Sequence, residues 1–147
     1  MGFFETYKNI LLVIVILLFV QFWLGMVTNL FITLPSAAKV ISLNYSGSPE
    51  VLTHIFNGIL VVASAGALII YGTKLKIALI SKLSIIALVF VIIAVINGFT
   101  FAFYGQNNSY SIGMAMSFLI IYTVYFIEFY LIGKAIVATS SKVTSQG

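Results

Sequence analysis

The first long apolar stretch of the chain is residues 10–34, ILLVIVILLFVQFWLGMVTNLFITL, and it decides the fold class. A helix needs about 20 mainly apolar residues to cross the hydrocarbon core of a bilayer, and this stretch is long enough. It is longer than the apolar core of a cleavable signal peptide, which has about 7–15 residues. We therefore expect it to stay in the protein as the first membrane span.

Three further apolar runs follow, at about 51–71, 79–103 and 112–132. The composition agrees, with 62% hydrophobic and 7% charged residues, whereas a soluble domain carries roughly 25% charged residues. Too few polar side chains are present to cover a soluble core. The sequence predicts an all-α membrane protein with one domain over 1–147, an antiparallel bundle of four transmembrane helices joined by short loops.

The lysines indicate how the bundle is oriented. Lys39 alone lies on one predicted side, and six lysines lie on the other: Lys8, Lys74, Lys76, Lys82, Lys134 and Lys142. Basic residues near span ends mark the cytoplasmic side. We predict a multi-pass protein of the cell membrane with both termini cytoplasmic. Because the lysines are scattered at span ends, nucleic acid is not an expected partner. The expected partners are the lipid bilayer and other membrane subunits or a second copy.

The two halves of the chain echo each other. Residues 29–31 (NLF) and 97–99 (NGF) lie at equivalent depths in the first and third spans. The second and fourth spans end on similar residues, 68–72 (LIIYG) and 129–133 (FYLIG). Internal repeats are common in membrane folds. The echoes suggest a duplicated two-helix hairpin.

Polar side chains inside the spans are the candidates for a functional site. Asn29, Asn57 and Asn97 each lie roughly 9 Å below the outer membrane boundary, given the rise of about 1.5 Å per helical residue. Gln21 lies on the same helical face as Asn29. These residues predict a polar layer in the outer leaflet. Such a layer either bonds helices to one another, for about 1 kcal/mol or less per bond, or forms a site.

His54 is the only histidine in the chain. Imidazole is a common ligand of metals and haem iron. A His/Met pair of haem ligands, His54 with Met114 or Met116, is chemically sound. A zinc or copper site is not predicted, because the chain has no cysteine, no second histidine and no aspartate. The alternative is a histidine that only hydrogen-bonds a neighbour.

Glu128 is the one acidic residue inside a predicted span. A carboxylate there could relay protons or bind an ion. It could equally extend to the interface and pair with Lys74, Lys76 or Lys134. The sequence contains no nucleophile–base pair, phosphate-binding loop or paired carboxylates, so no catalytic residue is assigned and an enzyme is not the favoured class.

The stretch 24–29 (LGMVTN) ending at 34–35 (LP), followed by an outer loop and a span that opens with His54, resembles one half of the haem A synthase family. That family is built from two four-helix halves, and histidines at the outer ends of the second and fourth helices of a half ligate haem. His54 matches the second-helix ligand. The fourth-helix position falls at 112–114, where no histidine stands, and the family's catalytic acidic residue has no match.

The resemblance implies haem as a cofactor, with synthase activity itself in doubt. It favours a subunit or an assembly or accessory factor of a respiratory, haem-associated membrane complex. Two other functions stay open. One is a purely structural scaffold, and the other is a small oligomeric transporter or channel that uses Glu128 and the asparagine layer.

Overall fold

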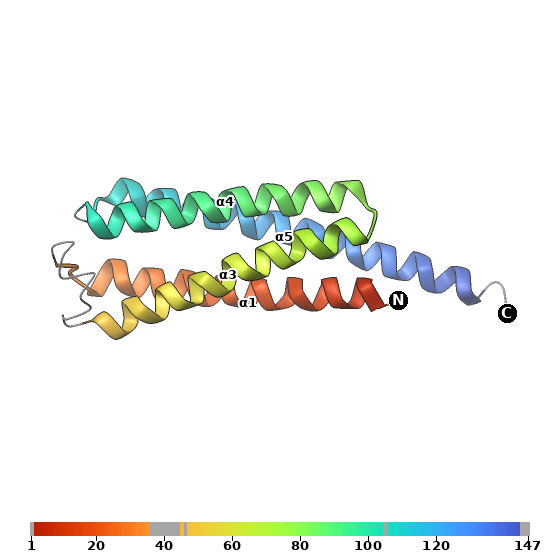
Figure 1. Cartoon of the computed structure of the whole chain (residues 1–147), viewed down its shortest axis with the longest axis horizontal. Helices are drawn as coiled ribbons and strands as arrows, with labels where there is room; N and C mark the ends of the chain where they lie inside the picture. Colours follow the sequence, from red (N-terminus) through yellow and green to blue (C-terminus); the bar gives the residue numbers. More distant parts are fainter. Residues whose placement is uncertain (1, 36–44, 46, 105, 145–147) are drawn as a thin grey trace.

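A computed structural model describes residues 2–35, 45, 47–104 and 106–144, with side chains through residue 138. These residues form four helices: α1 (Gly2–Phe31), α3 (Ser48–Lys74), α4 (Ala78–Phe103) and α5 (Asn108–Thr144). Figure 1 shows them alongside one another in one bundle, with α5 extending past the others at one end. All four are long and apolar enough to cross a membrane. The described residues confirm the prediction of a helical fold with four helices able to span a membrane.

The helices begin and end at other residues than the predicted spans. α1 already begins at Gly2, so the residues before the apolar run are helical too. It ends at Phe31, before the predicted end at Leu34. Leu34 directly precedes Pro35, and a proline disfavours helical backbone at the residue before it. α5 begins at Asn108, between the predicted spans 79–103 and 112–132. Lys39 and most of the residues between the predicted spans 10–34 and 51–71 lie outside the described residues.

The helices pack in a ring, in which α1 contacts α3 and α5, and α4 contacts α3 and α5. The most extensive interfaces are those within the two hairpins, α1 with α3 and α4 with α5. Each helix contributes one stripe of buried residues spaced by three and four, as helical periodicity requires. The stripes consist of Tyr7, Leu11, Ile14 and Leu18 in α1, Val61, Ala65 and Leu68 in α3, Ile80, Ser84, Ala87 and Val91 in α4, and Ile121, Tyr125, Glu128 and Ile132 in α5.

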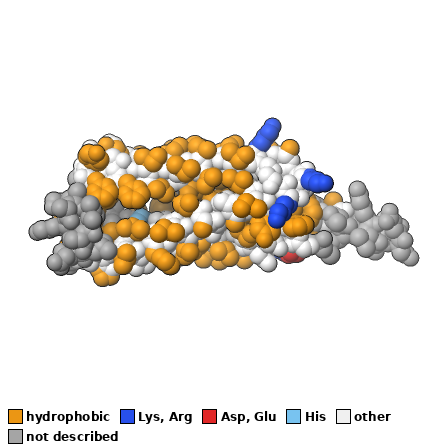
Figure 2. All heavy atoms as spheres, viewed as in Figure 1, with side chains coloured by type: hydrophobic (Ala, Val, Ile, Leu, Met, Phe, Trp, Pro, Cys, Tyr) orange, Lys and Arg blue, Asp and Glu red, His pale blue; other side chains and the backbone are white. Residues whose placement is uncertain are grey.

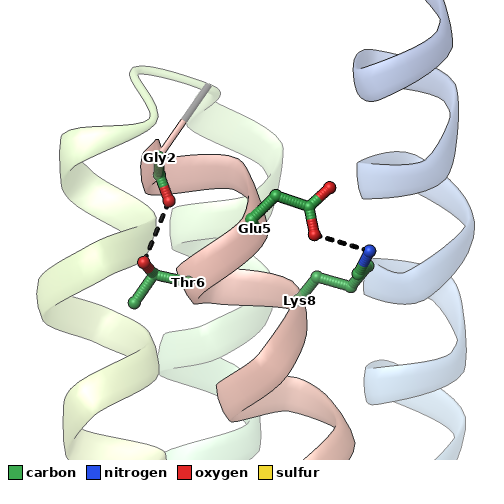
Figure 3. Close-up of polar contacts among 4 residues, drawn as sticks. All are labelled: Gly2, Glu5, Thr6 and Lys8. Atoms are coloured by element: carbon green, nitrogen blue, oxygen red, sulfur yellow. Dashed lines mark hydrogen bonds and ion pairs between the residues drawn. The ribbon is translucent and has the colours of Figure 1, made fainter.

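The end of the bundle where α1 and α4 begin is here called the lysine end. Figure 2 shows the blue lysine side chains gathered toward this end. Lys74 lies 5.7 Å from the centre of the Phe3 ring, which places the end of α3 beside the start of α1. Lys8 forms an ion pair with Glu5 at 2.6 Å, on the side of α1 that faces α5 (Figure 3). Basic side chains therefore surround the first turns of the bundle at one end.

The opposite end, here the loop end, is held together by the side chain of Gln106. Its Nε2 donates to the carbonyl oxygen of Ile32 at 2.8 Å. Its Oε1 accepts from the backbone N–H of Leu34 at 3.0 Å. One side chain from the α4–α5 connection thus satisfies two backbone groups just beyond the end of α1. It replaces the hydrogen bonds that a continuing helix would have made.

Glycines allow close approach within each hairpin. In α1 and α3, a Cβ on Gly25 would lie 3.4 Å from His54 Cε1. In α4 and α5, a Cβ on Gly113 would lie 2.6 Å from Asn97 Oδ1. Both hairpins therefore seat a polar side chain of one helix against the bare backbone of the other. This shared feature agrees with a duplicated hairpin, which stays a prediction.

Candidate functional site

The first polar centre lies between α1 and α3 and consists of Gln21, His54 and Asn57, here called the histidine cluster. The Asn57 amide donates to the carbonyl oxygen of Leu17 at 2.9 Å and to Gln21 Oε1 at 2.7 Å. Gln21 Nε2 lies 3.2 Å from His54 Nε2, so the glutamine amide donates to the imidazole when that nitrogen carries no proton. Three polar side chains from two helices thus form one chain of hydrogen bonds.

This packing does not fit haem ligation through His54 Nε2. That nitrogen faces the Gln21 amide at 3.2 Å, where an iron atom would have to lie. The edge of the imidazole rests against the backbone of α1 at Gly25. His54 Nδ1 is buried, with no hydrogen-bond partner among the described residues. His54 is therefore placed as a hydrogen-bond partner of Gln21.

The two methionines predicted as further ligands lie elsewhere. The sulfur of Met114 sits 3.4 Å from where a Cβ on Gly98 would be, between α4 and α5. Met116 is 54% exposed on the surface of the bundle. The structure thus places His54 in one hairpin and Met114 in the other, and it does not bring the predicted ligand set together.

The three asparagines of the predicted polar layer have different surroundings. Asn57 is buried and bonds across α1 and α3. Asn97 donates to the carbonyl oxygen of Ile93 in its own helix at 2.9 Å and rests against Gly113 of α5. Asn29 is half-buried near the end of α1. Asn57 is thus bonded to α1, whereas Asn97 is bonded within α4 and rests against α5, so these two asparagines belong to different helix interfaces.

The second polar centre lies between α1, α4 and α5 and consists of Tyr7, Ser84 and Glu128, here called the carboxyl cluster. Tyr7 Oη donates to Glu128 Oε2 at 2.8 Å, and Ser84 Oγ donates to Glu128 Oε1 at 2.9 Å. The two hydroxyl oxygens lie 2.9 Å from each other. All three side chains are at most 1% exposed. Three helices are therefore joined through one carboxyl group.

The alternative in which Glu128 extends to the interface and pairs with a lysine is wrong. Glu128 is fully buried, and it faces the hydroxyls of two other helices instead of water. Lys74 lies against the rings of Phe3 and Tyr71, and Lys134 lies over the ring of Tyr130. The Glu128 side chain points inward because Glu128 belongs to the buried stripe of α5. A residue on the side of the helix that faces the core cannot also reach the membrane interface.

Sequence reasoning missed Tyr7 and Ser84. Tyr7 lies in the segment before the first apolar run, which we did not expect to be part of the core. Ser84 is the one hydroxyl residue in the apolar run 83–96, and that isolation is the signal that could have singled it out. An intramembrane polar side chain usually faces the bundle interior and finds a partner there.

The described residues form a bundle of four helices able to span a membrane, in which two clusters of interior polar side chains bond across helices. Comparison with protein-family models, with curated proteins and with solved structures found no match to this chain.

Proposed function

We propose that this chain is an integral protein of the cell membrane that works as a subunit or accessory factor of a larger membrane complex. One observation carries the proposal. The polar side chains of the histidine and carboxyl clusters are engaged in hydrogen bonds between helices, and large hydrophobic side chains cover much of the lateral surface that Figure 2 shows. The apolar lateral surface of such a bundle can contact lipid or another transmembrane helix.

The proposed topology has four antiparallel helices with both termini in the cytoplasm. The lysine end supports this topology, because four lysines lie near the helix ends that meet there. Lys8 is near the start of α1, Lys74 and Lys76 are at or just after the end of α3, and Lys82 is near the start of α4. Basic residues are retained on the cytoplasmic side of a membrane. The course of the colours along the bundle in Figure 1 agrees with helices that alternate in direction.

A hollow on the lateral surface supports contact with another helix. It is shallow and open to the surface, and it lies between α1 and α3. Its lining includes the small residues Ala63, Ser64 and Ala67 and the exposed Asn9. Membrane helices associate through small residues that permit close approach and through polar side chains that bond across the interface.

Purification of the full chain in a mild detergent, with mass spectrometry of what accompanies it, tests the proposal. We expect at least one other membrane protein at a fixed ratio to the chain. A monodisperse sample of this chain alone would contradict the proposal. Filling the hollow by Ala67→Leu should release the partner, whereas Ile85→Leu, at an exposed position of α4, is the matched control.

Haem association in this complex rests on the resemblance of residues 24–35 and His54 to the haem A synthase family. An absorbance spectrum of the same preparation tests it. Haem association predicts a Soret band from the complex and none from the isolated chain, because Gln21 faces His54 Nε2 there; a complex without a Soret band would contradict haem association. A Soret band that disappears in His54→Ala would show that haem binds in another conformation.

Because the chain lacks cysteine, single cysteines can report its orientation. Glu50→Cys lies at the start of α3 and Lys76→Cys lies in the α3–α4 turn, and both positions are exposed. A membrane-impermeant maleimide applied to intact cells should label the first variant. It should label the second only after the cells are opened, and the reverse pattern would invert the proposed topology.

A second candidate function is proton-linked transport by an oligomer, and the burial of Glu128 among three helices favours it. Intramembrane carboxyl groups commonly serve as proton relays. Reconstitution in liposomes with a pH-sensitive dye tests this candidate. Proton flux that is lost in Glu128→Gln would support it, and equal flux in liposomes with and without the protein would exclude it.

A further inference from the structure

The hydrogen bonds of the carboxyl cluster need more protons than two hydroxyl groups supply. Four close oxygen pairs meet there: Tyr7 Oη with Glu128 Oε2, Ser84 Oγ with Glu128 Oε1, Tyr7 Oη with Ser84 Oγ, and Ser84 Oγ with the carbonyl oxygen of Ile80 at 3.0 Å. A tyrosine and a serine hydroxyl each carry one proton. With an ionised carboxylate, two of the four pairs would therefore face each other without a hydrogen between them.

One additional proton on Glu128 removes most of this shortage. The bond between Ser84 Oγ and Glu128 Oε1 then reverses its direction: the carboxylic acid donates from Oε1 to Ser84 Oγ, and Ser84 donates onward to the carbonyl oxygen of Ile80. Tyr7 donates to the other carboxyl oxygen, Oε2. Three of the four pairs become hydrogen bonds, and every hydroxyl proton has an acceptor. The geometry therefore suits the acid form of the side chain better than its anion.

The charged groups around the cluster do not compensate an anion. On α1, Lys8 is paired with Glu5, at 42% and 48% exposure. On α3 and α5, Lys74 and Lys134 lie over aromatic rings at the surface, and on α4 Lys82 is exposed. Tyr125, the other titratable group beside Glu128, has a buried hydroxyl with no hydrogen-bond partner among the described side chains. A carboxylate buried without a cation is strongly disfavoured.

We propose that Glu128 is a proton-binding site that holds α1 against α4 and α5. A hydronium ion at the lysine end gives its proton to the carboxylate and leaves a water molecule. The acid formed then donates to Ser84 and accepts from Tyr7. The site lies about two helical turns inside the lysine end, because Ser84 is six residues after the start of α4 and each residue rises about 1.5 Å. Loss of the proton leaves a buried charge and weakens the contact of α1 with the other two helices.

Infrared spectroscopy of the full chain in liposomes at neutral pH tests this assignment. The spectrum should contain a carboxylic acid C=O band that moves when the sample is exchanged into D₂O and that is lost in Glu128→Gln. The matched control, Glu50→Gln, changes an exposed carboxyl at the start of α3 and should keep the band. A carboxylate band from Glu128 at neutral pH would overturn the proposal.

The hydrogen-bond roles are tested by two further variants. Tyr7→Phe removes the donor to Oε2, so the C=O band should move to higher wavenumber, whereas Tyr130→Phe at an exposed position of α5 should leave it in place. A band that is unchanged in Tyr7→Phe would contradict the assigned donor. Glutamine has the shape of the protonated acid, so Glu128→Gln should fold. Failure of this variant to fold would show that the negative charge is needed.

Proton binding also predicts how stability depends on pH. The folded state holds the proton at pH values where the unfolded carboxyl in water has already released it, so stability should fall as pH rises above about 4, where a free glutamate titrates, and should level off once the folded state has lost the proton too. Thermal unfolding should show a falling midpoint for wild-type protein and a flatter profile for Glu128→Gln. Equal slopes would refute a role of the proton in packing. A wild-type profile that shifts with sodium concentration at fixed ionic strength would assign the site to a metal cation instead.

Discussion

Replacing Gly113 of α5 by alanine tests whether α4 and α5 approach each other as closely as the structure places them. A Cβ added at Gly113 would lie 2.6 Å from Asn97 Oδ1, 2.9 Å from its Cγ and 3.1 Å from its Nδ2. Ordinary contact begins at 3.4 Å, so the Asn97 amide would have to move by about 0.8 Å (3.4 − 2.6). That amide is also bonded to the carbonyl oxygen of Ile93 at 2.9 Å, and the movement strains this bond.

Two effects of the substitution compete. Alanine is the better helix former, by about 1 kcal/mol relative to glycine. Overpacking of a close contact costs about 1–3 kcal/mol. Gly133, in the same helix, isolates the first effect, because a Cβ there meets nothing within 4 Å. Gly113→Ala should therefore be about 1–3 kcal/mol less stable than Gly133→Ala, since the gain in helix propensity is common to both.

The free energy of unfolding can be measured in mixed micelles, with the fluorescence of Trp23, the chain's single tryptophan, as the probe. Asn97→Ala should largely rescue Gly113→Ala, because it removes the side chain that the new methyl group meets. Such non-additivity is expected for residues in contact. If Gly113→Ala is as stable as Gly133→Ala, or if the double variant is simply additive, the close approach of the two helices is refuted.

Three further predictions concern the polar centres and the loop end. Asn57→Ala and Gln21→Ala should show a coupling of about 0.6–1.7 kcal/mol in a double-mutant cycle of unfolding free energies, and additive effects would argue against their hydrogen bond. Gln106→Ala should speed hydrogen exchange at the amide it binds beyond the end of α1, without changing exchange in the core, and protection that survives would contradict the clamp. Tyr7→Phe should lower the unfolding free energy by about 1–3 kcal/mol, whereas Tyr125→Phe removes a buried hydroxyl without a partner and should be neutral or stabilising; equal losses in both would contradict the assigned bonds.

The fold class could be predicted because it follows from composition and run length. A run such as 83–96 carries no charge, and in a bilayer its backbone groups must be satisfied within the segment, which requires a helix. The ends of the helices were harder to predict. α1 begins at Gly2, and its last residues depend on Gln106, which comes from another part of the chain. Such a contact leaves no local signal.

Which face of each helix points inward could not be predicted from the residues. In a soluble bundle the apolar stripe marks the core, but these helices are apolar all round because lipid is as apolar as the interior. Tyr7, Ser84 and Glu128 do follow the three-and-four spacing of the buried stripes. The surrounding apolar residues hide that periodicity, so Glu128 could be expected equally at the interface or in the core.

By itself, the sequence determined that this protein has four apolar helices, that its lysines gather near one set of helix ends, and that its few intramembrane polar groups are the candidates for chemistry. These properties depend on composition and on spacing along one segment. Only the tertiary structure decided that His54 meets Gln21 and that Glu128 meets Tyr7 and Ser84. The partners of Glu128 are separated from it by 121 and 44 residues, and only the packing of the helices brings such groups within hydrogen-bond distance.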